Sequence, residues 1–245
     1  MAFSLGEHDL RGVLDVVDAV DHVDDGPVLP WPLLHELKGL IGCHSIAVSG
    51  QDEATLGEFA VQDLPAEPDI ELSEEWWRAH YWDYLHCSYP QRTGDLRSVT
   101  MISDFYSDRQ YHQTAMYAGF LRLSDVEHEI MVCLPAGPGR FLKVMFGRGR
   151  GADFGERERA ILALLRPHLY TAYVTSEHRR LGIRPLTARQ EELMQYVAAG
   201  FSNQQIARRL GVSESTVRKH MENIFARLQV TSRTAAIGRA REPAF

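Results

Sequence analysis

Near the C-terminus, four polar and charged side chains are spaced so that a helix would present them together. Arg218 and Lys219 are adjacent, and each lies three or four residues from Ser215 and from Glu222, which places all four on one side of a helix. In the major groove of double-stranded DNA, Arg and Lys donate hydrogen bonds to guanine, and Glu accepts one from cytosine. Ser213, Thr216 and the free amide groups of a helix start are suited to hold phosphate. These residue types predict a surface that contacts double-stranded DNA.

Three successive helices with a glycine turn are predicted to position these side chains. Thr187-x-x-Gln190 and Ser202-x-x-Gln205 have the spacing of capping boxes, so each opens a helix. Gly211 supplies the positive φ of a tight turn, and Ser213 caps a third helix that reaches Leu228. Four apolar residues of the third helix form the stripe that must face inward: Val217, Met221, Ile224 and Leu228. Two short helices joined by such a turn constitute a helix-turn-helix.

The formal charge of the chain changes sign before this segment. Residues 1–183 hold 16 Lys and Arg against 28 Asp and Glu, a charge of −12, whereas residues 184–245 hold 10 against 5, a charge of +5. The net charge of −7 over 245 residues therefore conceals a basic C-terminal part. A polyanion is expected as the partner of that part alone.

Residues 186–241 resemble the LuxR/GerE-type DNA-binding domain without a gap. The matching residues fall in four runs: Leu186-Thr187-x-Arg189, Gly200-x-Ser202-Asn203-x-x-Ile206-Ala207, Ser213-Glu214-x-Thr216-Val217-Arg218-x-His220 and Asn223-Ile224-Phe225-x-x-Leu228-x-Val230-x-x-Arg233-Thr234. The resemblance implies a four-helix unit whose third helix reads DNA and whose last helix, about 233–241, supports homodimerisation on a two-fold-related site. From these runs, Thr187, Asn203 and Arg233 join the predicted DNA-binding residues.

Three positions depart from the pattern of that family. Gln190 stands where Glu is usual, which keeps the helix cap, and Gln204 stands where Lys is common, which takes away one potential phosphate contact. Gln229 stands where Gly is common, which causes strain if the backbone there is left-handed.

The first 180 residues predict an α+β domain with one central, mainly antiparallel sheet and flanking helices. Helical periods cover residues 4–22, 31–41, 107–117 and 155–181, with a further helix after Ser73. β-prone runs cover residues 43–49, 55–62, 98–103, 130–134 and 141–146. This order is not the strict strand–helix alternation of a doubly wound sheet.

Three local features refine these expected elements. Ser4-x-x-Glu7 has the spacing of a capping box and predicts the start of the first helix. Gly119 is expected to stop the helix of residues 107–117. Pro167 is expected to kink or divide the helix of residues 155–181.

Three parts are predicted along the chain: a GAF/PAS-like sensory or dimerisation domain over 1–154, a connecting helix over 155–183 and the LuxR-type domain over 184–245. A phosphoacceptor receiver would need an Asp at a strand end and an acidic pair after its first strand. Asp24 and Asp25 follow a predicted helix instead, and Asp52 lies in a hairpin turn. The nucleotide-binding pattern GxxxxGK[ST] is absent from the sequence. A small-molecule domain, of the kind that includes the acyl-homoserine-lactone sensors, remains.

Five aromatic residues fall within nine positions of that domain, and three of them are the candidate ligand contacts. Trp77, Tyr81 and Tyr84 have a spacing similar to that of the lactone sensors, but Tyr89-Pro90 stands where those proteins have Asp-Pro. A lactone ligand is therefore not favoured. The rings either plug the core between helix and sheet or line a pocket for a small apolar or aromatic metabolite.

The sequence assigns no catalytic residue, metal or cofactor. Cys43, Cys87 and Cys133 form no CxxC pair, the histidines lack ligand spacing, and no GxSxG occurs. No apolar run approaches the ~20 residues that cross a bilayer. The first ten residues carry Glu7 and Asp9 rather than a basic signal region, so we expect a cytoplasmic protein without a membrane partner.

Together, these patterns predict a homodimeric, sequence-specific DNA-binding transcriptional regulator that is not an enzyme and responds to a small-molecule signal. Two alternatives stay open. One is a ligand-independent regulator whose N-terminal domain only dimerises. The other is an enzyme or metabolite-binding module with a nucleic-acid tether.

Overall fold

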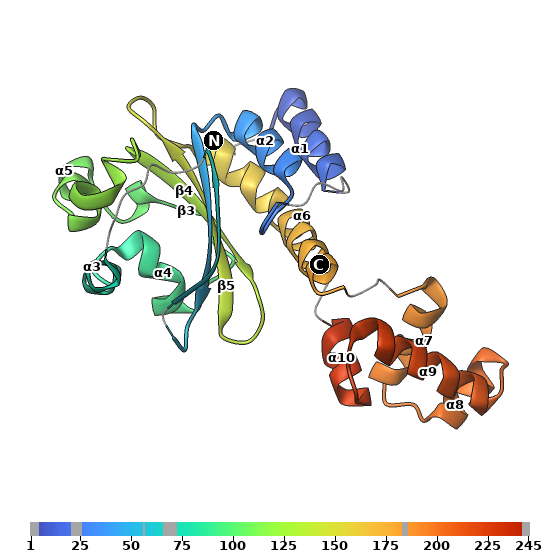
Figure 1. Ribbon diagram of the computed structural model, residues 1–245. Helices are drawn as coiled ribbons and strands as arrows, with labels where there is room; N and C mark the ends of the chain where they lie inside the picture. The colour runs from blue at the N-terminus through green and yellow to red at the C-terminus, as the bar shows by residue number, and fades with distance from the viewer. Residues whose placement is uncertain (1–4, 21–25, 56, 66–72, 183–185, 242–245) are drawn as a thin grey trace. The chain divides into compact units, whose positions relative to one another are not determined.

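The computed structural model describes five stretches of the chain: residues 5–20, 26–55, 57–65, 73–182 and 186–241. The chain divides into two compact units, Met1–Tyr173 and Val174–Phe245. The first unit contains a sheet with helices on both sides, and the second contains a group of short helices (Figure 1).

The described strands of the first unit form one antiparallel sheet in the order β2-β1-β5-β4-β3. Their bounds are β1 (Ser45–Asp52), β2 (Gly57–Leu64), β3 (Thr100–Met101), β4 (His128–Pro135) and β5 (Arg140–Arg148). The pairs β1–β2 and β4–β5 are antiparallel hairpins, formed by strands that follow one another in the sequence. The predicted α+β fold with a mainly antiparallel sheet is confirmed.

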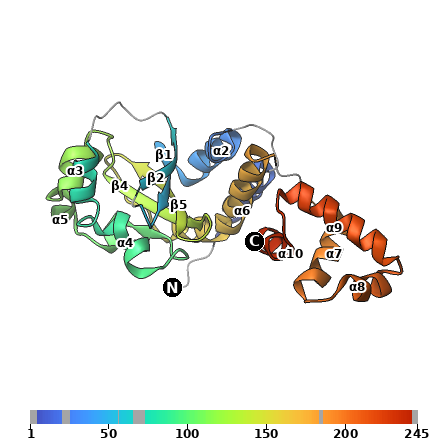
Figure 2. The same cartoon turned by 60° about the horizontal axis from the view of Figure 1, so that its bottom comes forward.

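One face of the sheet is apolar and lies under α2 (Trp31–Ile41) and α6 (Glu156–Arg180). Figures 1 and 2 show both helices on the same side of the strands. Val48, Val144 and Val132 lie side by side across three strands, and all three are fully buried. Each such side chain contributes about 1.5–3 kcal/mol of hydrophobic stabilisation, so this layer holds the unit together.

The opposite face of the sheet is buried but carries polar side chains. It lies under α3 (Glu74–His80), α4 (Leu85–Thr93) and α5 (Asp108–His112), on the other side of the sheet in Figure 1. Ser49, Lys143 and Cys133 form one row across it, and each is less than a tenth exposed. Buried polar groups need hydrogen-bond partners. In this respect the polar face differs from the apolar face under α2 and α6.

The aromatic segment forms two helices rather than the single helix predicted. α3 ends at His80, and α4 begins at Leu85 with Tyr84 as its N-cap. The Tyr84 ring is buried and stacks on Tyr106, with centroids 5.6 Å apart and planes within 5°. This tertiary contact overrides the helical period of the sequence.

Two predicted elements between α4 and β4 are also corrected. Gly119 does not stop a helix, because it lies inside the π-helix η2 (Tyr117–Leu121). A β-carbon on Gly119 would lie 2.5 Å from Trp76 Cζ2, so the glycine permits a close approach to α3. The predicted strand over 98–103 is reduced to β3, and the 3₁₀-helix η1 (Ile102–Asp104) follows it.

The first and last helices of the unit differ from their predicted ends. α1 (Glu7–Ala19) begins after Gly6, whose amide donates to the Asp9 carboxylate at 3.0 Å. Asp9 therefore closes the first turn in place of Glu7, and Ser4 lies outside the described residues. α6 continues through Pro167 without division.

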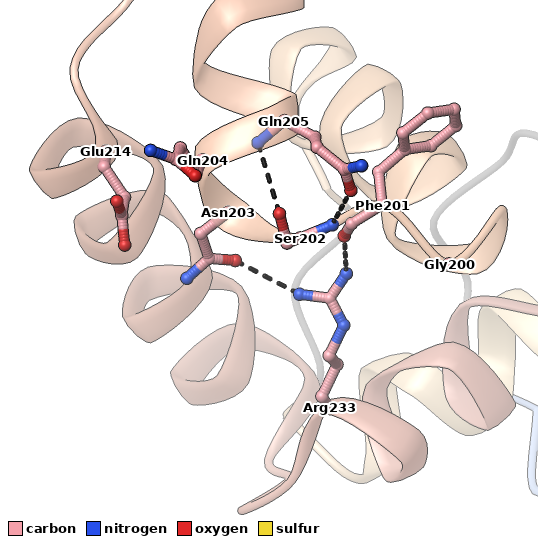
Figure 3. A pocket seen from close by; sticks show the side chains of 8 residues that line it. All are labelled: Gly200, Phe201, Ser202, Asn203, Gln204, Gln205, Glu214 and Arg233. Carbon is pink, nitrogen blue, oxygen red and sulfur yellow. Dashed lines mark hydrogen bonds between the residues drawn. The ribbon is translucent and has the colours of Figure 1, made fainter.

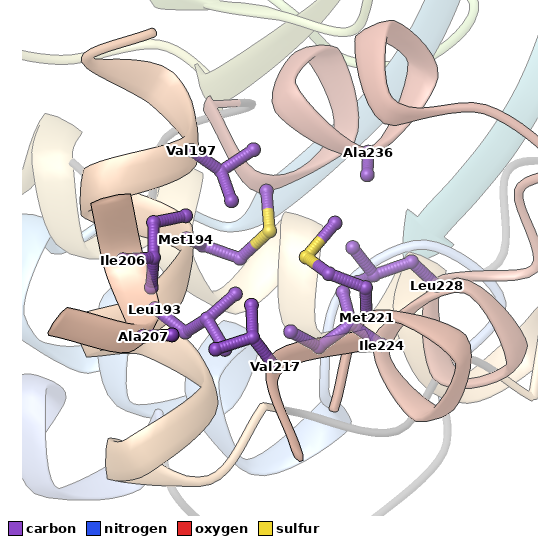
Figure 4. Close-up of a cluster of buried hydrophobic side chains, with 10 residues drawn as sticks. All are labelled: Leu193, Met194, Val197, Ile206, Ala207, Val217, Met221, Ile224, Leu228 and Ala236. Atoms are coloured by element: carbon purple, nitrogen blue, oxygen red, sulfur yellow. The ribbon is translucent and has the colours of Figure 1, made fainter. Parts of the chain in front are cut away.

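Four described helices form the second unit: α7 (Ala188–Ala198), α8 (Asn203–Leu210), α9 (Glu214–Leu228) and α10 (Arg233–Arg241). Apolar side chains from all four meet in one core (Figure 4): Leu193, Met194, Val197, Ile206, Ala207, Val217, Met221, Ile224, Leu228 and Ala236. The predicted inward stripe of the third helix is confirmed. Gly211 ends α8 with φ +66°, which confirms the predicted turn.

We expect Gly211→Ala to destabilise the second unit by about 1–2 kcal/mol, because an L side chain in a left-handed backbone crowds the following carbonyl. Gly238→Ala is the matched control. An added β-carbon would meet no atom within 4 Å at either glycine, but Gly238 lies inside α10 without a positive φ. Alanine should therefore stabilise that helix by about 1 kcal/mol. Urea titrations followed by circular dichroism should shift in opposite directions, and equal shifts would contradict the role of the turn.

Candidate nucleic-acid interface

The helix α9 begins with a capped first turn whose hydroxyl groups remain at the surface. Ser213 is the N-cap, and its Oγ accepts a hydrogen bond from the Thr216 amide at 3.1 Å. The same oxygen lies 2.7 Å from Ser215 Oγ and 2.8 Å from Thr216 Oγ1. Both serines are exposed. The cap thus fixes the helix start and presents hydroxyl groups beside the positive end of the helix dipole.

The outer face of α9 is the surface that the helical phase predicts. We use this name for four exposed residues: Ser215, Arg218, Lys219 and Glu222. The inward stripe of the same helix is buried in the core of the second unit. Burial therefore distinguishes the inner face of α9 from its outer face. The structure therefore brings these four predicted residues together at the surface of the second unit.

The two cations of the outer face are held by weak ion pairs. Arg218 Nη2 lies 3.7 Å from Glu214 Oε1, and Lys219 Nζ lies 3.3 Å from Glu222 Oε2. All four side chains are about half exposed or more. Pairs at such exposure contribute about 0–1 kcal/mol, so a base edge or a phosphate can replace the glutamate partner at little cost.

Arg233 connects the start of α10 to the start of α8. Its Nη1 donates to Asn203 Oδ1 at 3.1 Å, and its Nη2 donates to the Phe201 carbonyl, as Figure 3 shows. Arg233 and Asn203 border a hollow of about 640 Å³ with these further residues: Gly200, Phe201, Ser202, Gln204, Gln205 and Glu214. The guanidinium thus positions the loop before α8. Direct contact of Arg233 or Asn203 with DNA stays a prediction.

Thr187 caps α7 as the sequence predicts. Its hydroxyl accepts from the Gln190 amide at 3.4 Å, and its own amide donates to Gln190 Oε1 at 3.0 Å. The glutamine in place of the usual glutamate therefore keeps the capping box. Thr187 is exposed beside the cap, and its contact with DNA stays a prediction.

Two arginines that are not among the predicted site residues also shape this unit. Arg189 donates to Glu192 at 2.5 Å and to the Leu210 carbonyl at 3.2 Å, which ties α7 to the end of α8. The Arg209 guanidinium lies 4.2 Å from the centroid of the Phe201 ring. Both contribute to the basic excess of the C-terminal segment. The number of charged residues does not show where a side chain points, so the sequence could not predict these contacts.

Gln229 adopts the left-handed backbone at which the family commonly has glycine. Its φ is 52°, so the strain expected for this position applies. Its Nε2 donates to the Leu181 carbonyl at 2.8 Å, a bond that glycine could not make.

In the first unit, the three residues predicted to bind a ligand have different surroundings. Trp77 and Tyr84 belong to the aromatic cluster beside the sheet, and Trp77 meets Phe120 at 5.0 Å between ring centroids. The Tyr81 hydroxyl donates to the Cys87 carbonyl at 3.0 Å, and its ring lies under the Lys143 ammonium. Trp77 and Tyr84 therefore help to fill the core, and a ligand contact by any of the three stays a prediction.

The described residues contain neither a metal-binding cluster of acidic, His or Cys side chains nor a membrane-spanning helix. No group of three or more His, Cys, Asp or Glu side chains in this part of the chain could hold a metal ion. Its helices also include none with the length and apolar character needed to span a membrane.

Known proteins share the C-terminal segment. The family model of bacterial regulatory proteins of the luxR family (GerE) matches residues 184–240. The putative HTH-type transcriptional regulator YhjB of Escherichia coli (strain K12) is 44% identical over 54 residues, which are 22% of this chain and 27% of that protein. The uncharacterized transcriptional regulatory protein YhcZ of Bacillus subtilis (strain 168) is 30% identical over 150 residues, 60% of this chain and 61% of that protein.

One solved structure is similar along nearly the whole chain. It is SdiA in complex with octanoyl-rac-glycerol, at 13% identity and a TM-score of 0.48, over 98% of this chain and 97% of that one. The chain therefore spans about a quarter to three fifths of the length of these sequence relatives. On the family model, residues 184–240 are a helix-turn-helix segment of the luxR family of bacterial regulatory proteins.

Proposed function

We propose that this chain is a sequence-specific DNA-binding transcriptional regulator, acting as a homodimer under the control of a small molecule. The observation that carries the proposal is the exposed outer face of α9 on a helix-turn-helix domain of the luxR family. In this proposal, residues 1–154 sense the signal, residues 155–183 connect, and residues 184–245 read DNA. The relatives with which it shares its C-terminal segment are named as transcriptional regulators.

The side chains of the outer face have separate roles in this proposal. Arg218 and Lys219 donate to guanine in the major groove, and Glu222 accepts from cytosine. Ser213 and Thr216 hold phosphate at the helix start, where the dipole favours an anion. Ser215, Thr187, Asn203 and Arg233 complete the predicted contacts at the border of the site.

The distribution of charge supports this division of labour. The C-terminal segment carries +5, and the rest of the chain carries −12. DNA therefore attracts the reading domain and repels the sensing domain, which favours one orientation on the duplex.

Selection of binding sites by the full-length protein tests the proposal. The protein is mixed with a pool of random double-stranded DNA, and the bound duplexes are sequenced. We expect enrichment of one motif made of two inverted half-sites, because a two-fold dimer reads a palindrome. Sedimentation of the protein with the selected duplex should show two chains per duplex. A pool without enrichment would contradict sequence-specific binding, and a single half-site with one bound chain would contradict the homodimer.

A further inference from the structure

Lys143 is a buried cation in the middle of the polar face of the sheet. It lies on β5 between Ser49 of β1 and Cys133 of β4, so a strand flanks it on either side. Only 3% of the residue is exposed. Its Nζ lies 4.8 Å from the centroid of the Tyr81 ring, on the side of the sheet covered by α3 and α4. The ammonium group is thus enclosed between the sheet and the aromatic segment.

Burial and neighbouring groups act on the pKa of Lys143 in opposite directions. Burial lowers the pKa of Lys143, but the neighbouring Tyr81, Cys87 and Glu58 raise it, and the net shift is upward. Burial raises the pKa of Cys87 to about 11 and that of Cys133 to about 12, so both thiols are neutral at pH 7. Neither thiol therefore balances the ammonium charge.

Carboxylates of the described residues do not form an ion pair with Lys143. Within the ranges that the structure describes, no Asp or Glu oxygen lies within 4.0 Å of its Nζ. Glu58 acts on it from farther away, is exposed, and accepts instead from Ser49 Oγ at 2.5 Å and Gln51 Nε2 at 3.2 Å. The Tyr81 ring supplies about 0.5–2 kcal/mol. That is less than the several kcal/mol needed to take an ammonium ion out of water.

Other polar atoms of the same interior also lack partners. Tyr84 Oη and Thr100 Oγ1 are buried without a hydrogen bond among the described residues. Such atoms are rare in folded proteins and mark a place where a partner is missing. Apolar side chains stand beside them on the same face: Met131, Phe141 and Met145. This side of the sheet therefore carries the buried Lys143, polar atoms without partners, the buried pair His86–Glu129 at 3.1 Å, and apolar side chains.

We propose that the signal molecule of this regulator is an organic acid with an apolar or aromatic body, and that Lys143 is the counter-ion of its carboxylate. The inference rests on the proposed function, because it assigns a chemical class to the small molecule of the sensing domain. The carboxylate accepts from the ammonium group above the Tyr81 ring. The apolar body lies against the methionine side chains, and Tyr84 and Thr100 supply further hydrogen bonds.

Matched pairs of acids and primary amides test this inference on the full-length protein. The probes are octanoate and octanamide, dodecanoate and dodecanamide, phenylacetate and phenylacetamide, and indole-3-acetate and indole-3-acetamide. A ligand that binds only the folded state raises the thermal midpoint, and the midpoint rises with concentration. We expect at least one acid to raise the midpoint while its own amide, which has the same shape without the charge, leaves it unchanged.

Two substitutions at Lys143 identify the group that binds. Lys143→Met keeps the length of the side chain and removes the charge, so the affinity for the acid should fall at least tenfold. Lys143→Arg keeps the charge and should retain part of the affinity. Glu58→Gln removes a negative charge that acts on Lys143 from a distance and would repel an acid, so it should strengthen binding. Lys38→Met, which removes an ammonium group from α2, is the control and should bind the acid as the unaltered protein does.

Three results would overturn the inference: equal shifts with acids and amides, unchanged acid binding by Lys143→Met, or no shift with any of the four acids. If Lys143→Met fails to fold, the acid–amide comparison and Lys143→Arg still decide the question. Selection of DNA sites is measured separately. Intact DNA selection without acid binding overturns only the inference, and acid binding without DNA selection overturns only the proposed function.

Discussion

Replacing Ile224 with alanine should destabilise the second unit by about 2–5 kcal/mol. Ile224 is fully buried at the centre of the core that all four helices share. The substitution removes three carbon atoms and leaves a cavity that short, capped helices fill poorly. A loss of this size is a large part of the stability of a small domain, so α9 would lose its fixed place.

Two spectroscopic signals separate this effect from the rest of the chain. All four tryptophans, Trp31, Trp76, Trp77 and Trp82, lie in the first unit, so their fluorescence reports on that unit. In urea, circular dichroism should show an earlier loss of helix in Ile224→Ala, while the fluorescence midpoint stays in place. The neighbouring Asn223 is exposed, and Asn223→Ala should change stability by less than about 0.5 kcal/mol. An unchanged dichroism midpoint in Ile224→Ala would contradict the core assignment.

Arg218→Ala and Lys219→Ala should each weaken binding to the selected duplex by about 1–3 kcal/mol, or about 5- to 150-fold. Both cations stand on the outer face of α9, where their glutamate partners hold them only weakly. Because neither side chain is part of the core, the folded state should keep its stability. The expected loss of affinity therefore reflects weaker DNA recognition and not a less stable fold.

Fluorescence anisotropy with the selected duplex and with a scrambled duplex measures this loss. A cation that reads bases changes the preference for the selected duplex, whereas a cation on phosphate weakens both duplexes alike and lowers the salt dependence by about one unit. Arg11→Ala removes an exposed arginine of α1 and should bind as the unaltered protein does. Unchanged affinity in both Arg218→Ala and Lys219→Ala would remove them from the site.

The second unit could be predicted from the sequence because its signals are local. Ser202 and Gln205 cap a helix through bonds three residues apart, and Gly211 needs only its own backbone angle. The inward stripe of α9 follows from the helical period, and it also fixes the outer face by exclusion. What the sequence could not give is the contact of Arg233 with Asn203, 30 residues away.

The first unit was harder to predict because distant contacts decide its details. Tyr84 fits a helical period but serves as the N-cap of α4, where its ring stacks on Tyr106. Gly119 has the usual form of a helix stop, yet it makes room for Trp76. The sequence did not indicate that Lys143 is buried, because a lysine in a β-prone run can equally face solvent or the interior. Only the pairing of β5 between β1 and β4 shows that it is buried.

A thermodynamic cycle between Arg218 and one guanine atom of the selected duplex shows whether α9 reads DNA in the major groove. Each guanine is replaced in turn by 7-deazaguanine, which lacks the N7 acceptor of the major groove. Affinities are measured for the full-length protein and for Arg218→Ala. We expect that at one guanine the two changes together weaken binding no more than either alone. If the two losses simply add at every guanine, α9 does not read the major groove through Arg218.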